Sequence, residues 1–292
     1  MSRSRATAIG FTAILMWALL ALLTVGSAPV PPFLLSVICF GIGGGLALIW
    51  VLAGRGPGVF RGIPVSAYVF GTAGLFGYHF LYFSALRIAP AAEAGLIAYL
   101  WPLLIVLLSG LLPGEKLRAG HLIGAALAFA GAAIILLPDE AGLAAEALPG
   151  YGLAFLCAIT WAIYSVGSRR FGMVPTEVVT IYCLATAVLS LIAHLGFEET
   201  VWPESTTGWI SIVALGIGPV GAAFFTWDIG MKKGDIQFLG VASYAAPLLS
   251  TLALILAGIA AATPVIVAAA VLIAAGAAIA ARAGRSSIGK GG

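Results

Sequence analysis

Two ten-residue stretches of the sequence place a tyrosine and a proline at the same spacing inside apolar runs. They read GLIAYLWPLL at 95–104 and GVASYAAPLL at 240–249, which both fit G-x-x-x-Y-x-x-P-L-L and lie 145 positions apart. A proline inside a helix removes a backbone hydrogen bond and clashes with the preceding turn, at a cost of about 3 kcal/mol. We therefore expect both helices to break here, with Pro102 and Pro247 as helix-break or gating residues.

Each break is expected to release one carbonyl, because proline has no N–H for the residue four positions earlier. These carbonyls belong to Ala98 and Ser243. Within a membrane a free carbonyl is tolerated where protein or water in a cavity satisfies it. The alternative is a kink that only shapes helix packing.

Aromatic and polar side chains gather in the same apolar runs. Tyr78 and Tyr82 are four positions apart and so share one helix face, with His79 beside them. Such side chains combine flat apolar area with a hydrogen-bonding group, which suits binding of a solute. The alternative for each is a contact between neighbouring helices or an interfacial belt. The candidate substrate-binding residues are Trp17, Tyr78, His79, Tyr82, Tyr99, Trp101, Trp161, Tyr164, Ser243 and Tyr244.

The composition excludes a soluble globular domain. The 292 residues are 62% hydrophobic and 9% charged, whereas soluble domains carry about 25% charged residues. Apolar runs of about 20 residues are long enough to cross a lipid bilayer as helices. Ten such spans are predicted, at residues 7–27, 33–53, 66–86, 91–112, 119–137, 150–168, 177–196, 207–229, 237–258 and 263–282.

Lysine and arginine lie on one side of this predicted topology. All but one of the 14 fall on the side of the termini, and Arg87 alone falls on the other. The opposite loops carry acidic residues, among them Asp139 and Glu140. The positive-inside rule then predicts a multi-pass protein of the cell inner membrane with both termini in the cytoplasm.

The offset of 145 extends beyond the tyrosine–proline motif and indicates an internal repeat. Each repeat holds five predicted helices, an odd number, so the second must enter the membrane from the opposite side. We predict an all-α membrane protein of ten transmembrane helices in two inverted repeats, 1–145 and 146–292. Other equivalent positions at this offset are Gly71 with Gly216, Phe80 with Phe225 and Tyr82 with Trp227.

The ten spans, the five-plus-five repeat, the cytoplasmic termini and the paired motifs resemble the drug/metabolite transporter superfamily. Within it the chain is similar to the EamA-type exporters, and most closely to the YddG-type aromatic amino acid exporters. The resemblance implies a basket-like fold with a central cavity lined mainly by the first, third, fourth, sixth, eighth and ninth spans. It also implies export of aromatic and other neutral amino acids from the cytoplasm.

Missing charges and motifs narrow the alternatives. The first span has no carboxylate near its middle, where small multidrug transporters carry one, which argues against proton-coupled export of cationic drugs. A nucleotide-sugar or organic-phosphate carrier would need Lys or Arg at the midplane, and the predicted spans offer none there. No P-loop, H-E-x-x-H or G-x-S-x-G motif occurs, so an intramembrane enzyme is the least favoured alternative.

We therefore expect a secondary or facilitative transporter and not an enzyme. It would export neutral, especially aromatic, amino acids and related metabolites by alternating access, with the two five-helix halves rocking about a midplane site. Simple downhill export is favoured over proton coupling through His79. We expect no cofactor, no metal and no nucleic-acid partner, and a monomer.

Overall fold

The computed structural model describes residues 1–137 and 145–285, and within these ranges the chain forms helices and turns without a strand. Asp139 and Glu140, whose charges entered the topology prediction, lie outside the described residues. The described chain has ten spans that are long and apolar enough to cross a membrane, which confirms the predicted number. They run over Arg3–Gly26, Pro32–Gly54, Val65–Ile88, Ala91–Ser109, Ala119–Leu136, Ala145–Phe171, Thr176–Phe197, Thr206–Lys233, Ile236–Leu256 and Pro264–Ala283.

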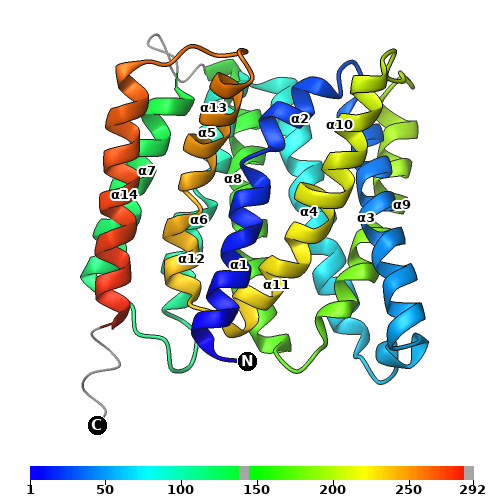
Figure 1. Ribbon diagram of the computed structural model, residues 1–292, viewed down its shortest axis with the longest axis horizontal. Coiled ribbons are helices and arrows are strands. Elements are labelled where there is room, and N and C mark those ends of the chain that lie inside the picture. The colour runs from blue at the N-terminus through cyan, green and yellow to red at the C-terminus, as the bar shows by residue number, and fades with distance from the viewer. Residues whose placement is uncertain (138–144, 286–292) are drawn as a thin grey trace.

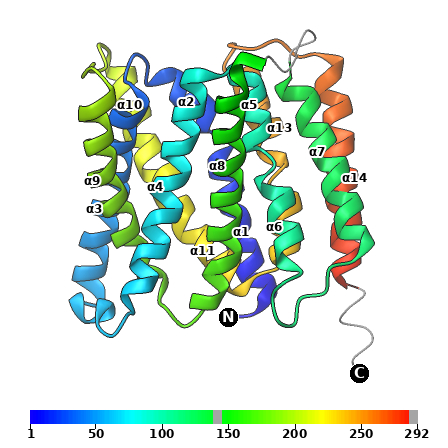
Figure 2. The ribbon, with the colours of Figure 1, turned by 180° about the vertical axis from the view of Figure 1, so that it is seen from behind.

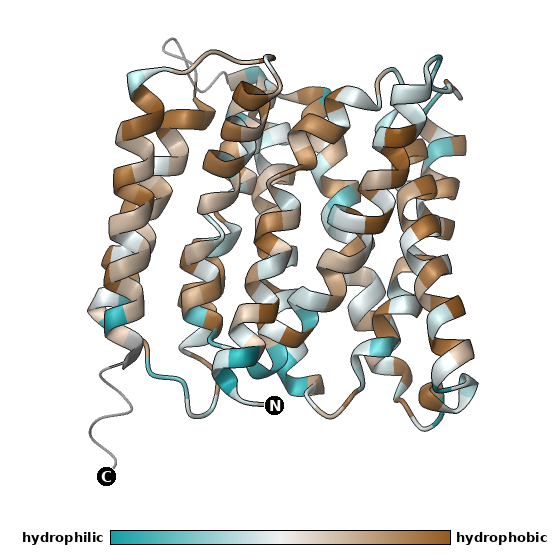
Figure 3. Cartoon of the chain, viewed as in Figure 1, coloured by the Kyte–Doolittle hydropathy of each residue, from teal (hydrophilic) through white to brown (hydrophobic). Residues whose placement is uncertain are grey.

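The spans stand side by side in one bundle, with polar residues gathered toward its two ends (Figures 1 and 3). We call the end at which the first helix begins the proximal end, and the opposite end the distal end. One edge of the bundle is formed by α7 (Ala119–Leu136) and α14 (Pro264–Arg285), as Figure 1 shows. The other edge is formed by α3 (Pro32–Gly54) and α9 (Val179–Phe197), which the reverse view in Figure 2 also shows.

Four spans are interrupted near their middle, and two of the interruptions follow directly from the paired motifs. One helix stops just before each motif proline and the next begins, so the proline falls in a first turn where its missing N–H costs little. A third interruption is a π-helical turn at a Gly-Pro pair, Gly218–Ala222, and the fourth follows Trp17. The segments are α1 (Arg3–Trp17) and α2 (Leu20–Gly26), α5 (Ala91–Ala98) and α6 (Trp101–Ser109), α10 (Thr206–Ile217) and α11 (Ala223–Lys233), and α12 (Ile236–Ala242) and α13 (Ala245–Leu256).

The remaining central helices, α4 (Val65–Ile88) and α8 (Leu148–Gly167), are continuous. Short 3₁₀ turns complete the described connections: η1 (Pro57–Phe60), η2 (Ala145–Ala147), η3 (Ser168–Phe171) and η4 (Thr176–Val178).

The most extensive helix packing joins the two halves of the sequence. Helix α1 packs along α11, α3 along α9, α4 along α8 and α7 along α14. In each pair one helix comes from 1–145 and the other from 146–292. Rocking one sequence half rigidly against the other would separate all four pairs, so this packing does not support the expected motion of whole halves.

Glycines allow the closest of these approaches. A Cβ added to Gly10 of α1 would lie 2.8 Å from the Cα of Gly230 in α11, and one added to Gly43 of α3 would lie 2.7 Å from the Cα of Gly221. Both distances are shorter than carbon atoms tolerate without contact strain. Small residues at such crossings let membrane helices gain dispersion contacts along their backbones.

Candidate substrate site

Four tryptophans from four helices form a closed layer in the middle of the bundle. Trp17 ends α1, Trp101 begins α6, and Trp161 and Trp227 lie within α8 and α11. Their ring centroids lie between 5.0 and 6.4 Å apart in all six pairings. All four side chains are buried, the most exposed being Trp17 at 9%.

Two of these indoles are anchored by hydrogen bonds from their N–H groups. Trp17 Nε1 donates to the carbonyl of Pro219 at 3.1 Å, within the π-helical turn that interrupts the α10–α11 span. Trp227 Nε1 donates to Ser165 Oγ at 3.0 Å. Because protein groups satisfy both donors, we treat this layer as a fixed floor of the site.

Three tyrosines and a histidine lie next to this floor and are only partly buried, and two of the tyrosines contact it directly. The rings of Tyr78 and Tyr82 are stacked with their planes 4° apart. Tyr78 contacts Trp161 at 5.1 Å between centroids, and Tyr99 contacts Trp101 at 6.2 Å. All four side chains keep partial exposure, so a solute could still reach part of each of them.

The polar atoms of this group have unused hydrogen-bonding capacity. Among the described residues, the hydroxyls of Tyr78, Tyr82 and Tyr99 have no protein hydrogen-bond partner. His79 Nδ1 lies 2.7 Å from the carbonyl oxygen of Leu75. That oxygen can only accept, so Nδ1 is the donor and Nε2 of the neutral ring is left as an acceptor.

The wall behind His79 is apolar. Phe40 of α3 meets the imidazole at 5.0 Å between ring centroids, with the planes 87° apart, and Phe224 of α11 lies 6.1 Å away. No carboxylate contacts His79 among the described residues. The group therefore offers hydroxyl and imidazole hydrogen bonds beside wide apolar faces, without a fixed charge.

The second motif is placed differently from the first. Ser243 and Tyr244 are both fully buried, and the Ser243 hydroxyl donates to the carbonyl of Leu239 at 2.7 Å. The Ser243 carbonyl accepts from the N–H of Ala246 at 3.0 Å. The expectation that this carbonyl is free is therefore wrong, because the chain tightens by one residue at the break and supplies another donor.

Tyr244 instead closes the break in the first motif. Its hydroxyl accepts a hydrogen bond from the N–H of Leu103 at 3.1 Å. In an uninterrupted helix this N–H would donate to the carbonyl of Tyr99, four residues earlier. Tyr244 thus satisfies a backbone group released by the other half of the chain, and fixes the start of α6 where Trp101 lies.

The remaining candidate residues, Tyr164 and the two motif prolines, lie outside the group of Tyr78, His79, Tyr82 and Tyr99. Tyr164 is buried, lies 5.2 Å from Trp161 between ring centroids, and packs where Gly74 leaves room for it. Its hydroxyl is buried and has no partner. Pro102 and Pro247 are buried beside the two breaks.

Three side chains of this region were not predicted as site residues from the sequence: Trp227, Phe224 and Phe40. Trp227 could have been found from the repeat, because it occupies the position equivalent to Tyr82. Phe224 and Phe40 had no such signal, since an aromatic residue in an apolar helix is more often simple packing.

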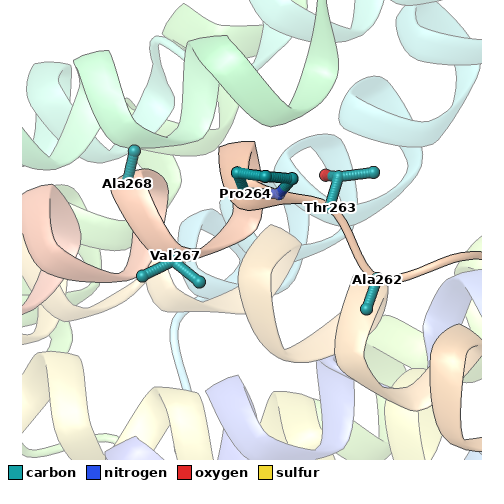
Figure 4. A pocket seen from close by; sticks show the side chains of 5 residues that line it. All are labelled: Ala262, Thr263, Pro264, Val267 and Ala268. Atoms are coloured by element: carbon teal, nitrogen blue, oxygen red, sulfur yellow. The ribbon is translucent and has the colours of Figure 1, made fainter.

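Other features of the described residues do not offer a second site of this kind. No three His, Cys, Asp or Glu side chains among them are grouped as metal ligands. A shallow hollow before and at the start of α14 is formed mainly by small apolar side chains (Figure 4). None of the ten candidate residues lines it; its lining residues are Ala262, Thr263, Pro264, Val267 and Ala268.

Comparison with known proteins decides the family. The model of the EamA-like transporter family matches residues 5–137 and again residues 148–282. This chain belongs to that family. The match confirms the predicted EamA-type resemblance, and its two stretches fall within the two predicted repeats.

Individual relatives agree with this assignment. The chain is 58% identical over 265 residues to the aromatic amino acid exporter YddG of Ancylobacter novellus, covering 89% of this chain and 91% of that protein. It is 27% identical to the aromatic amino acid exporter YddG of Escherichia coli K12, and this alignment covers 86% of this chain and 88% of that protein. A protein of known crystal structure is 56% identical to this chain, and the two structures superpose with a TM-score of 0.93. The match covers 98% of this chain and 99% of the chain in that structure.

Proposed function

We propose that this protein exports neutral amino acids, especially aromatic ones, and related metabolites across the cell inner membrane by alternating access. The group of Tyr78, His79, Tyr82 and Tyr99 would bind the substrate above the tryptophan floor. The proximal end, which carries nearly all the basic residues, would face the cytoplasm.

The observation that carries this proposal is the chemistry of that group. Its hydroxyls and the imidazole Nε2 have no protein partner, so they are available to the amino and carboxylate groups of a zwitterion. The flat faces of Tyr78, Tyr82 and Trp101 would contact an apolar side chain. Because the group carries no fixed charge, it fits a solute without net charge better than a cation or a phosphate.

The names of the relatives support the same solute class. Both exporters described above are called aromatic amino acid exporters, and the alignment with the Ancylobacter novellus protein covers 91% of that protein at 58% identity. A biotin transporter of Escherichia coli K12 is 29% identical over 169 residues and covers 56% of this chain. Biotin is therefore a useful competitor in the assay.

The helix packing suggests which parts would move. Helices α4, α5 and α6 pack on α8 and would form a first body, while α1 and α11 pack along each other and would form a second. Each body mixes both halves of the sequence. The edge pairs α3–α9 and α7–α14 would act as the frame between which these bodies tilt.

Transport by purified protein in proteoliposomes tests the proposal. We expect saturable flux of labelled phenylalanine, weaker flux of threonine, and none of a quaternary ammonium cation. Excess unlabelled biotin should leave phenylalanine flux nearly unchanged. Movement of the cation alone, or complete inhibition by biotin, would contradict the proposed substrate class.

A further inference from the structure

A network of charged side chains crosses the proximal end of the bundle. Glu115, in the connection between α6 and α7, pairs with Arg169 of η3 at 2.5 Å and with Arg3 of α1 at 3.2 Å. Arg3 also lies 3.5 Å from Asp235, which precedes α12. The Glu115 side chain is only 8% exposed, although it lies in a connecting segment.

Arg169 uses its whole guanidinium in this network. Nη1 binds Glu115, Nε donates to the carbonyl of Met231 at 2.9 Å, and Nη2 donates to the carbonyl of Gly234 at 2.6 Å. Both carbonyls lie at the end of α11. Arginine presents these donors in a rigid planar fork, so the three contacts hold the end of α8 in one position against α11.

The network joins the two proposed moving bodies. Glu115 and Arg169 follow α6 and α8 of the first body, whereas Arg3 and the two carbonyls belong to α1 and α11 of the second. Two contacts connect the bodies directly: the ion pair of Glu115 with Arg3, and the hydrogen bonds of Arg169 to the carbonyls at the end of α11. Helix α12 packs on α6 of the first body and on α1 of the second, so it lies between the two bodies.

The charged contacts at the distal end connect different elements. Glu198, just after α9, pairs with Arg87 of α4 at 3.1 Å and accepts the N–H of Phe33 at the start of α3 at 2.9 Å. These bonds tie α4 to the α3–α9 edge and leave the second body out. Among the described residues, ion pairs that link the two bodies therefore lie at the proximal end.

We propose that Glu115 and Arg169 form a latch that keeps the proximal end of the transport path closed. Opening toward that end requires Glu115 to leave Arg3, and Arg169 to leave the carbonyls of Met231 and Gly234. The latch rests on the alternating-access part of the proposed function. It does not depend on which solute is carried.

Two cysteine reporters test the latch in protein held in lipid nanodiscs. The three native cysteines, all buried, are first replaced by alanine. Ile14→Cys places a thiol on α1 three residues before Trp17, at a position that is 0% exposed and in the same apolar cluster as the floor. Tyr82→Cys places a thiol in the partly exposed group above it. A membrane-impermeant maleimide then reports access to each.

Arg169→Ala and Glu115→Gln should each speed labelling of the Ile14→Cys reporter at least tenfold and slow labelling of the Tyr82→Cys reporter. Two matched controls should change neither rate. Arg170→Ala removes an exposed neighbouring charge, and Glu177→Gln breaks the proximal ion pair with Arg55, which directly follows α3 and lies outside both bodies.

Unchanged labelling of the Ile14→Cys reporter in folded Arg169→Ala and Glu115→Gln proteins would overturn the latch. Faster labelling of both reporters together would also overturn it, because that result indicates a loosened fold. If Arg169→Ala does not fold, Glu115→Gln carries the test, since it keeps size and polarity and removes only the charge. A protein that shows the latch and moves no amino acid would contradict the substrate proposal alone.

Discussion

Tyr99 and Tyr244 occupy the same position of the repeated motif, and we predict opposite consequences for removing their hydroxyls. The Tyr244 hydroxyl is buried and accepts the N–H of Leu103, whereas the Tyr99 hydroxyl, in a partly exposed side chain, has no hydrogen-bond partner among the described residues. Replacing each tyrosine by phenylalanine removes one oxygen and keeps the ring. The pair is therefore a matched comparison within one molecule.

Tyr244→Phe should destabilise the protein by about 1–2 kcal/mol. The reason is that the Leu103 N–H would be left buried without a partner, and an unsatisfied buried donor costs about 1–3 kcal/mol. Interhelical hydrogen bonds in membrane proteins average a smaller value, about 0.6 kcal/mol, which favours the lower part of this range. Tyr99→Phe should change stability by less than about 0.5 kcal/mol, as expected where no bond is lost.

Reversible unfolding in mixed detergent micelles, followed by far-ultraviolet circular dichroism, measures both free energies. Phenylalanine flux should show the reverse order, with a larger loss in Tyr99→Phe than in Tyr244→Phe once the amounts of folded protein are matched. Equal destabilisation by the two variants would refute the assignment of Tyr244 as the partner of Leu103. So would a Tyr244→Phe protein as stable as the wild type.

Three further predictions concern packing, a helix terminus and the site. Gly10→Ala should destabilise the protein by about 1–3 kcal/mol because its Cβ would press on the backbone of α11, while Gly41→Ala, with nothing within 4 Å, should be neutral in the same unfolding assay. Glu198→Gln should lower the melting temperature, because a charged partner is lost at the start of α3, and Glu199→Gln, at an exposed neighbour, should not. His79→Ala should reduce phenylalanine flux at least tenfold with little loss of folded protein; full flux would remove His79 from the site.

The ten spans and two of the four interruptions were predicted because their signals are local, and the third, at Gly218–Ala222, also carries a local Gly-Pro signal. Length and hydropathy identify the spans, and proline identifies the breaks near Tyr99 and Tyr244. The interruption after Trp17 could not be predicted in this way. The residues there, Trp-Ala-Leu-Leu, are ordinary helix formers, and what distinguishes them is contact with tryptophans far along the chain.

The site was predicted less completely than the fold, because residues of the same type at equivalent motif positions lie in different surroundings. Both motifs read G-x-x-x-Y-x-x-P-L-L, yet Tyr99 is partly exposed and Tyr244 is sealed. Burial of a tyrosine depends on which helices pack beside it. The pairing of α1 with α11 and of α4 with α8 joins residues more than 60 positions apart, and no local pattern specifies those partners.

The central claim is that a neutral aromatic amino acid binds at the partly exposed tyrosine and histidine group and is carried across the membrane. Counterflow of labelled phenylalanine into proteoliposomes tests it most directly, with wild-type protein and Tyr99→Ala at equal folded amounts. We predict saturable counterflow by the wild type and a decrease of at least tenfold in the variant. No counterflow by the wild type, or undiminished counterflow by Tyr99→Ala, would contradict the claim.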